Sequence, residues 1–252
     1  MSDIKNILFT TDFSINAGKA LPYAIDIVKK ADGKFCLVNV YDIGLTNPSA
    51  ELITYEPAWL IFSKSARESA LLKLKRIVER NKLTHLHHRC FVREGGADHE
   101  ILKIIDRNNI HLVVMGIKGA GCKHNIFMGS VAKGVIQRSL SPVLIVPETA
   151  RHKKISNIAY AVDCRYKEKN MIYYLVRFAR LYNATITLFH LQPNNDTGKA
   201  NEKELIKLIN DAGYSKIRCC DTMVKETVKG VEDFVKNEQP DVLAITARTQ
   251  TL

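Results

Sequence analysis

The chain has 252 residues, of which 46% are hydrophobic and 25% charged, so it has room for one large globular domain or two ordinary ones. No apolar run approaches the roughly 18 residues of a membrane span, and an acid near the N-terminus argues against a signal peptide. We therefore expect a cytoplasmic protein. Its net charge of +11 favours anionic partners in general, without selecting among nucleic acid, a membrane surface and small phosphates.

The distribution of basic residues and cysteines further limits the expected partners and cellular compartment. Lys and Arg are interleaved with acids and apolar residues, as in residues 73–82, which is typical of solvated helix faces. Nucleic acid and membranes are therefore not expected as partners. No C-x-x-C pair occurs, so free thiols in a reducing compartment are expected. The six cysteines are Cys36, Cys90, Cys122, Cys164, Cys219 and Cys220.

Strand and helix signals alternate along the first half. Strands are expected over residues 6–12, 34–42, 87–95, 111–116 and 141–147. Helices are expected over residues 16–33, 65–82, 97–109 and 130–140, with Gly33 as the C-cap of the first. Residues 43–62, which contain Pro48 and Pro57, are expected to be irregular. Strands joined by crossover helices predict an open parallel sheet with helices on both faces.

The second half of the chain repeats the first. Residues 155–164 align with residues 4–13, which places Asn157 on Asn6 and Asp163 on Asp12. Later segments repeat the helix-then-strand pattern over residues 171–193 and 229–247. The predicted fold class is therefore α/β, with two tandem copies of a five-stranded-type parallel sheet. The predicted domains are residues 1–149 and 150–252, joined near residues 148–154.

The second copy stops where a glycine-rich loop follows the fourth strand of the first copy. Thr246 and Thr249 stand where Gly116 and Gly119 stand in the first copy. We therefore expect the second domain to be degenerate and truncated at its C-terminus, and the chain to carry one site of this type.

The loop over residues 115–130 is the strongest candidate for a binding site. In an open parallel sheet, ligands bind beyond the carboxyl ends of the strands. Gly116 and Gly119 are expected to allow positive φ, so that backbone N–H groups converge on an anion. Ser130 is expected to cap the following helix, whose N-terminus would add its dipole.

The spacing of this loop distinguishes between known patterns. Neither the P-loop nor the dinucleotide fingerprint is present, since no Gly-Lys-Ser/Thr occurs and position 124 is His. The spacing Gly116-x2-Gly119-x9-Gly129-Ser130 is instead similar to the nucleotide signature of universal stress proteins. The chain resembles a tandem member of that family over both halves. The resemblance implies an adenine-nucleotide alpha hydrolase-like fold that binds ATP, with Mg²⁺ as a candidate companion.

The resemblance also implies roles for individual residues of the first copy. Asp12 matches the acid that contacts the nucleoside, and Val40 the residue whose backbone reads the adenine edge. Met115 and Gly116 lie beside the ribose and phosphates. The implied phosphate cradle is Gly119, Gly129, Ser130 and Val131. Lys118, Lys123 and His124 lie within the loop and could add charge, although the family pattern does not require them. Substitution of Gly116 by valine is expected to abolish binding while sparing the fold.

Several functions are compatible with these residues. The resemblance implies a nucleotide-dependent switch in stress response or signalling. The two copies are expected to pack as an intramolecular pseudo-dimer, and the resemblance implies that the last strand of the first copy is the pairing edge. Because the second copy has no equivalent strand in this sequence, that edge is left unpaired, and a homodimer is therefore predicted. A slow ATPase is an alternative, although Asp12 is the only acid tied to the site and no catalytic base is identified. A second alternative is a protein-interaction module of the same fold that binds no nucleotide. His85, His87, His88 and Cys90 form a weaker candidate for a metal site, but a solvated His-rich edge is favoured.

Overall fold

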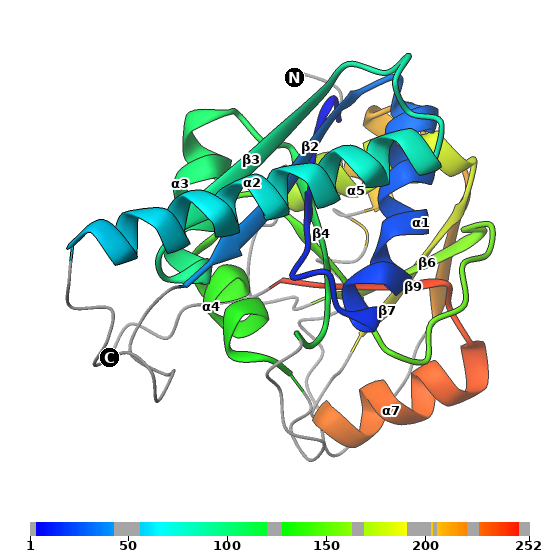
Figure 1. Ribbon diagram of the computed structural model, residues 1–252. Helices are drawn as coiled ribbons and strands as arrows, with labels where there is room; N and C mark the ends of the chain where they lie inside the picture. The colour runs from blue at the N-terminus through cyan, green and yellow to red at the C-terminus, as the bar shows by residue number, and fades with distance from the viewer. Residues whose placement is uncertain are drawn as a thin grey trace. The chain divides into compact units, whose positions relative to one another are not determined.

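The computed structural model (Figure 1) describes residues 4–42, 56–119, 128–162, 169–190, 203, 206–220 and 227–246. These residues form two compact units, one extending to His152 and the other beginning at Lys153. Some residues singled out in the sequence lie outside the described ranges. They are Pro48, Cys122, Lys123, His124, Asp163, Cys164 and Thr249.

The first unit is built on a five-stranded parallel sheet in the order β3-β2-β1-β4-β5. The strands are β1 (Asn6–Thr10), β2 (Lys34–Tyr41), β3 (His88–Glu94), β4 (Leu112–Gly116) and β5 (Val143–Val146). The helices are α1 (Ile15–Ala31), α2 (Glu56–Arg80), α3 (Ala97–Arg107) and α4 (Ser130–Arg138). The predicted α/β class with a parallel sheet is confirmed.

The core of this unit follows from apolar runs in the central strands. Helices α3 and α4 pack on the sheet face that carries Leu8, Val38 and Val113, all fully or almost fully buried. The residues that alternate with these, such as Ile7 and Phe9, are equally buried on the opposite face. Strands buried on both faces require helices on both faces, which is why the apolar runs are continuous rather than alternating.

Helix α2 begins earlier than its sequence suggests. The prediction that residues 43–62 are irregular is wrong for residues 56–62, because the helix starts at Glu56. Pro57 is therefore the second residue of the helix rather than a helix breaker. Proline is tolerated there because the first backbone N–H groups of a helix have no acceptor within the helix.

The end of α1 also differs from its prediction. The residue in the left-handed conformation is Asp32 (φ 45°), not Gly33. The Asp32 N–H donates to the Lys29 carbonyl and the Gly33 N–H to the Val28 carbonyl, which closes the helix in a Schellman motif. Gly33 has a different role, because a Cβ there would lie only 2.5 Å from the carbonyl oxygen of Lys5. Glycine allows the helix end to approach the segment entering β1.

The second unit repeats the central part of this sheet. Its strands lie in the order β8-β7-β6-β9 and are all parallel. Its elements are β6 (Asn157–Val162), α5 (Lys169–Tyr182), β7 (Thr185–His190), β8 (Ile217–Cys220), α7 (Thr227–Glu238) and β9 (Val242–Ile245). The described part of this unit contains no counterpart of β5. The tandem arrangement predicted from the repeat therefore agrees with the two sheets.

The strand register confirms the predicted alignment of the copies. In β1, Phe9 pairs with Val114, and in β6, Tyr160 pairs with Ala244. Two residues further along, Thr246 therefore occupies the position of Gly116. The Thr246 hydroxyl lies 3.1 Å from the Tyr160 hydroxyl, so a polar side chain is present where the first copy has none.

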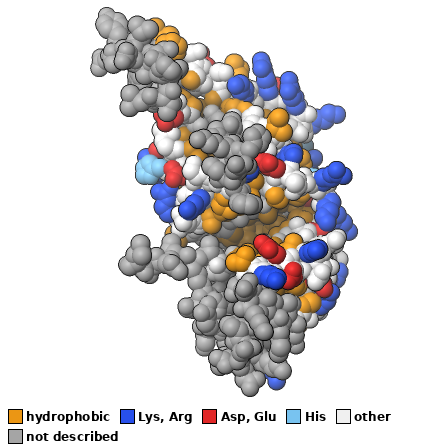
Figure 2. Space-filling view, turned by 90° about the horizontal axis from the view of Figure 1, so that it is seen from below, with side chains coloured by type: hydrophobic (Ala, Val, Ile, Leu, Met, Phe, Trp, Pro, Cys, Tyr) orange, Lys and Arg blue, Asp and Glu red, His pale blue; other side chains and the backbone are white. Residues whose placement is uncertain are grey.

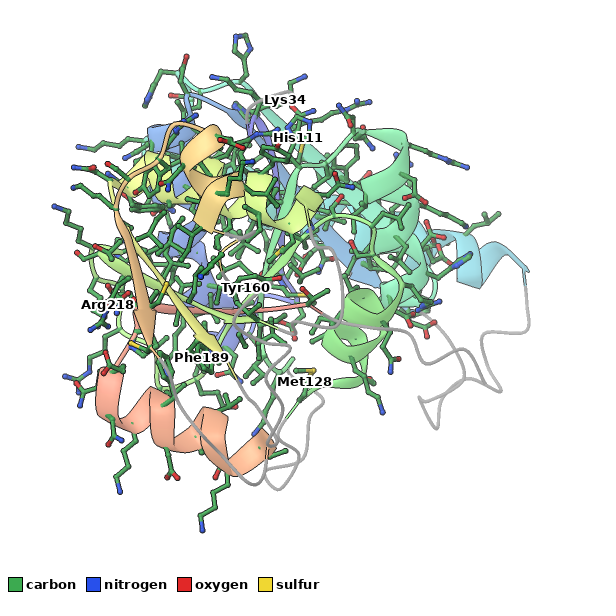
Figure 3. All side chains as sticks on the ribbon, turned by 180° about the vertical axis from the view of Figure 1, so that it is seen from behind. Lys34, His111, Met128, Tyr160, Phe189 and Arg218 are labelled. Atoms are coloured by element: carbon green, nitrogen blue, oxygen red, sulfur yellow. The ribbon has the colours of Figure 1, made fainter. Side chains whose placement is uncertain are left out.

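Both units satisfy the backbone at the start of the first strand with a side chain from just before the fourth strand. In the first unit, the Nδ1 of His111 (Figure 3) accepts from the N–H groups of Lys5 and Asn6, at 2.9 and 3.3 Å. In the second unit, one oxygen of Asp241 accepts from the N–H groups of Ser156 and Asn157, at 2.7 and 2.9 Å. The same backbone requirement is therefore met by a different acceptor.

Acidification is expected to weaken the second unit through Asp241. Burial acts to raise the pKa of this carboxyl, but hydrogen bonds from Lys153, Ser156 and Asn157 outweigh it, so the pKa is lowered. A lowered folded-state pKa stabilises the unit above the unfolded value of about 3.9, and this stability is lost as the pH falls through the folded value. Urea denaturation of the protein and of Asp241→Asn at pH 7 and pH 3 tests this. The difference in unfolding free energy between the native protein and Asp241→Asn should be smaller at pH 3 than at pH 7. An equal difference at both pH values would contradict the role of Asp241.

The described surface shows mixed charge. On the face drawn in Figure 2, Lys and Arg side chains lie among acidic and hydrophobic ones, as expected for solvated helix faces. None of the described helices meets the length and apolarity needed to cross a membrane. Cys36 and Cys90 form no disulfide within the described part of the chain, and burial raises the pKa of the Cys36 thiol to about 11, which makes it a poor nucleophile.

Candidate functional site

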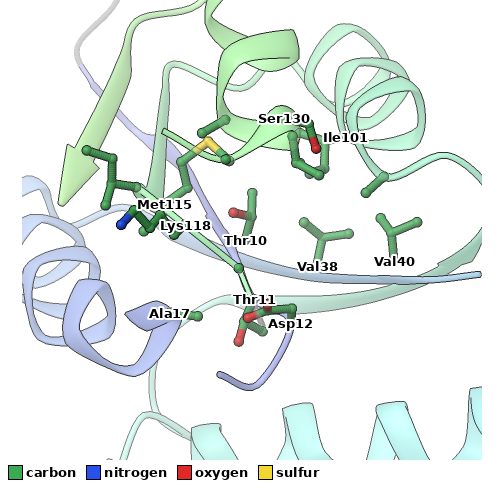
Figure 4. A pocket seen from close by; sticks show the side chains of 17 residues that line it. Thr10, Thr11, Asp12, Ala17, Val38, Val40, Ile101, Met115, Lys118 and Ser130 are labelled. Carbon is green, nitrogen blue, oxygen red and sulfur yellow. The ribbon is translucent and has the colours of Figure 1, made fainter. Parts of the chain in front are cut away.

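A cavity of about 370 Å³ lies at the carboxyl ends of β1, β2 and β4, a volume within the range of small-molecule sites (Figure 4). Apolar side chains form one part of its wall: Val38, Val40, Ile101 and Met115. Polar side chains form another: Thr10, Thr11, Asp12, Lys118 and Ser130. The cavity therefore offers both an apolar slot and a polar rim.

The predicted site residues that belong to the described part of the chain all line one cavity. They are Asp12, Val40, Met115, Gly116, Lys118, Gly119, Gly129, Ser130 and Val131. They come from the ends of three strands, the loop after β4 and the first turn of α4. Residues far apart in the sequence therefore meet, because parallel strands present their carboxyl ends at the same edge.

Other lining residues were missed from the sequence. They are Thr10, Thr11, Ala17, Val38, Ala97, Ile101, Ile117 and Ala132. One of them carried a usable signal, since Val38 is two residues before Val40 in a strand and so shares its face. Ala97 and Ile101 belong to no motif, and only the packing of α3 over β2 brings them to the cavity.

The turn after β1 holds Asp12 in place. One Asp12 carboxylate oxygen accepts a hydrogen bond of 3.0 Å from the N–H of Ser14. The neighbouring Thr11 is anchored to β2, because its carbonyl accepts from the buried Asn39 amide at 2.8 Å. Phe13 has a positive φ of 63°, and its N–H donates to the Thr11 hydroxyl at 2.9 Å. These bonds fix a carboxylate at the edge of the cavity.

The glycines of the loop serve close approach rather than unusual backbone conformation. The expectation of positive φ at Gly116 and Gly119 is wrong, since neither adopts it. A Cβ at Gly116 would lie 3.0 Å from the backbone oxygen of Asn16, and one at Gly119 would lie 2.7 Å from an Asp12 carboxylate oxygen. The expectation that Gly116→Val spares the fold is therefore not supported, because valine would press on the backbone of α1.

The start of α4 is capped differently from the prediction. The N-cap is Gly129, in an extended conformation (φ −68°, ψ 151°) and without a side-chain cap bond, and Ser130 is the first helical residue. The Gly129 carbonyl accepts the N–H of Lys133 at 3.0 Å, which starts the helix. The N–H groups of the first turn have no acceptor within the helix, and this turn contains no acidic residue. The helix end next to the cavity therefore favours an anion.

Lys118 supplies the basic side chain of the cavity wall. Its side chain is only 15% exposed, and its ammonium lies 3.7 Å from a carboxylate oxygen of Glu148, which follows β5. The amide of Asn16 donates to the same oxygen at 3.0 Å. Glu148 was not singled out from the sequence, because it belongs to no motif and is distant from the loop.

The second unit has an aromatic side chain at one position that lines the cavity in the first unit. Phe189 pairs with Ala161 as Val38 pairs with Thr10, so Phe189 takes the place of Val38. Phe189 (Figure 3) is fully buried and stacks on Phe234 of α7, with ring centroids 3.8 Å apart and planes 6° apart. The position of a small cavity-lining side chain is therefore filled in the second copy.

The other candidates are not brought together in a site. His85, His87 and His88 are exposed, in agreement with a solvated edge. Across the described ranges, no group of three or more His, Cys, Asp or Glu residues is arranged to hold a metal ion. On β8, Cys219 is exposed and Cys220 partly buried.

Comparisons with known proteins agree with this architecture. The chain is 29% identical to universal stress protein MJ0531 of Methanocaldococcus jannaschii over 142 residues, which cover 56% of this chain and 81% of the relative. It superimposes on protein MJ0577 with a TM-score of 0.52 and 26% identity, over 60% of this chain and all of the other.

Another solved structure extends the similarity to both units. A universal stress protein from Archaeoglobus fulgidus has a TM-score of 0.73 at 17% identity, over 95% of this chain and 86% of the other, and so shares the fold. Residues 3–147 match the universal stress protein family itself. With more than half of its length matched in this way, the chain belongs to the universal stress protein family.

Proposed function

We propose that the first unit binds ATP or another adenine nucleotide in the cavity, and that the protein acts as a nucleotide-dependent switch in stress response or signalling. The observation that carries this proposal is that the described residues predicted to contact a nucleotide all line one cavity. Family membership adds support, because the matched segment contains that entire wall.

The two ends of the cavity suit the two ends of a nucleotide. Val38 and Val40 offer an apolar surface for the base, whose burial contributes favourably to the binding free energy. The phosphates would lie at the N-terminus of α4, where first-turn N–H groups and the helix dipole stabilise anions. Asp12 would contact the nucleoside and, with the phosphates, would share any Mg²⁺ that accompanies them.

A switch is favoured over a slow ATPase by the chemistry of the wall. Asp12 is the one carboxylate among the described residues that line the cavity, and they include no histidine. Asp12 is also engaged by the N–H of Ser14, so it is poorly suited to activate water. We therefore propose that the bound nucleotide is sensed rather than rapidly consumed.

The remaining parts of the proposal concern organisation. We infer that residues 1–149 form the nucleotide domain and residues 150–252 a degenerate second domain, supported by the Phe189–Phe234 stack. We also propose a cytoplasmic homodimer that pairs through β5, which is an edge strand of its sheet. Analytical ultracentrifugation tests the dimer, and a purely monomeric protein would contradict it.

Analysis of co-purified ligand tests the main proposal directly. The protein is denatured, and the released small molecules are identified by mass spectrometry. Calorimetric titration with ATP follows on the refolded or ligand-free protein. Released ATP supports the switch, whereas ADP alone indicates turnover. A protein that is empty and does not bind added ATP would refute nucleotide binding.

Substitution of Gly119 by valine is expected to weaken ATP binding by about tenfold or more, the loss of one charged hydrogen bond. The new Cβ would lie 2.7 Å from an Asp12 oxygen, so the carboxylate must leave its position. Gly119 itself is exposed, and the fold should persist. Calorimetry gives the affinity. The matched control is Gly18→Ala in the first turn of α1, where a Cβ meets nothing within 4 Å. Equal ATP affinities of the two variants would exclude a role for the Asp12 carboxylate in binding the nucleotide.

A further inference from the structure

Glu148 is held beside Lys118 by two residues of α1. Its carboxylate accepts a 3.0 Å hydrogen bond from Asn16, and its backbone oxygen accepts a hydrogen bond from the Lys19 ammonium. Asn16 and Lys19 are three residues apart and so lie on one face of the helix. Both the side chain and the backbone of Glu148 are therefore fixed before any ligand binds.

This face of α1 continues to hold the chain after Glu148. The Tyr23 hydroxyl donates to the Arg151 carbonyl at 3.0 Å, and the Tyr23 ring meets the His152 ring edge-on at 5.0 Å. Residues 148–152 thus lie along α1. The position of Glu148 is part of this extended contact, and it does not depend on Lys118.

The contact between Glu148 and Lys118 is weaker than the hydrogen bonds that Glu148 makes with α1. Its 3.7 Å separation exceeds that of a normal hydrogen bond, so attraction between the charges is the main link. Glu148 is 43% exposed, which screens the attraction. The Lys118 ammonium can therefore leave this carboxylate at little cost.

Lys118 lines the same cavity as Ser130 at the start of α4, and this shared cavity is what makes Glu148 a competitor. In Figure 4, Lys118 lies beside Met115, whereas Ser130, which begins α4, lies with Ile101 on the other side of the cavity. An anion at the N-terminus of α4 would attract the same ammonium that Glu148 holds. One cation is therefore shared between two negative groups.

We propose that Glu148 is a positioning residue that competes with the phosphates of a bound nucleotide for Lys118, and thereby lowers the affinity for anionic ligands. This rests on the proposed nucleotide function of the cavity. Because the competition is between charges, it acts on nucleotides and leaves the uncharged nucleoside unaffected. Glu148 thus sets the balance between phosphate recognition and recognition of the base.

A double-mutant cycle tests this competition. Binding of ATP and of adenosine is measured by calorimetry at one salt concentration for the native protein, Glu148→Gln, Lys118→Met and the double variant. Glu148→Gln should bind ATP about three- to fivefold more tightly, the ratio expected from a partly exposed ion pair. Its affinity for adenosine should not change. In the Lys118→Met background, the same substitution should have no effect on ATP binding.

Glu148→Gln is a conservative change, since the glutamine oxygen can still accept from Asn16. The charge control is Glu79→Gln, at an exposed position of α2 that does not line the cavity. It should leave ATP affinity unchanged, and a gain equal to that of Glu148→Gln would refute the proposal.

The other outcomes separate the two proposals. A gain that persists without Lys118 would show direct repulsion by Glu148, and it would overturn the competition. So would weaker or unchanged ATP binding in Glu148→Gln. A native protein that binds neither ATP nor adenosine would instead contradict the nucleotide function on which the competition rests.

Discussion

Replacement of Gly33 by alanine is expected to destabilise the first unit by about 3 kcal/mol, the upper end of the usual cost of overpacking. The new Cβ would lie 2.5 Å from the Lys5 carbonyl oxygen and 2.8 Å from the Ile7 side chain, which is fully buried. Backbone cannot move aside like a flexible side chain, so the end of α1 must separate from β1. Urea denaturation followed by circular dichroism measures the loss.

Gly18→Ala is the matched control for this result. The position is helical and has open space, so alanine should stabilise α1 by about 0.5–1 kcal/mol through its better helix propensity. If Gly33→Ala were as stable as the native protein, the close approach of α1 to β1 would be wrong.

Substitution of Val38 by phenylalanine is expected to lower ATP affinity by about 100-fold, because it fills the slot proposed for the base. Val38 lies on the cavity wall, and Phe189 takes its place in the second unit. The exchange thus imposes on the first copy the side chain that the second copy has at this position. Calorimetry with ATP measures the effect, and thermal unfolding reports the expected overpacking cost of about 1–3 kcal/mol.

A graded series strengthens this test. Val38→Ile adds a single methylene to the wall, so its loss of affinity should be much smaller than that of Val38→Phe. Adenosine should lose affinity in parallel with ATP, because the base rather than the phosphates is displaced. A folded Val38→Phe protein that retains native ATP affinity would show that the base lies elsewhere.

The glycine loop shows how a pattern can identify positions without their physical reasons. Spacing and family resemblance selected Gly116, Gly119 and Gly129, and all three line the cavity. The expected positive φ is absent at Gly116 and Gly119, where close contacts with Asn16 and Asp12 require glycine instead. A sequence contains no record of which distant backbone passes near a Cα. From the sequence alone, backbone conformation was therefore the only available explanation for these glycines.

Helix boundaries show a similar limit. Pro57 is compatible both with an irregular segment and with the first turn of a helix, and the structure has the helix. Asp32 and Gly33 are both able to end α1, and Gly33 is needed for close approach, which leaves the left-handed position to Asp32.

The sequence by itself determined the features that depend on local periodicity and on repetition. These are the parallel α/β class, the tandem copies, the equivalence of Thr246 with Gly116, and the strand ends that carry Asp12 and Val40. Periodicity is local, and a repeat is a comparison of the chain with itself, so neither needs coordinates. Only the tertiary structure decided that Ile101 covers the cavity, that Phe189 stacks on Phe234, and that Glu148 lies beside Lys118. Those contacts join segments far apart in the chain, and their partners are chosen by packing and charge, which no local pattern encodes.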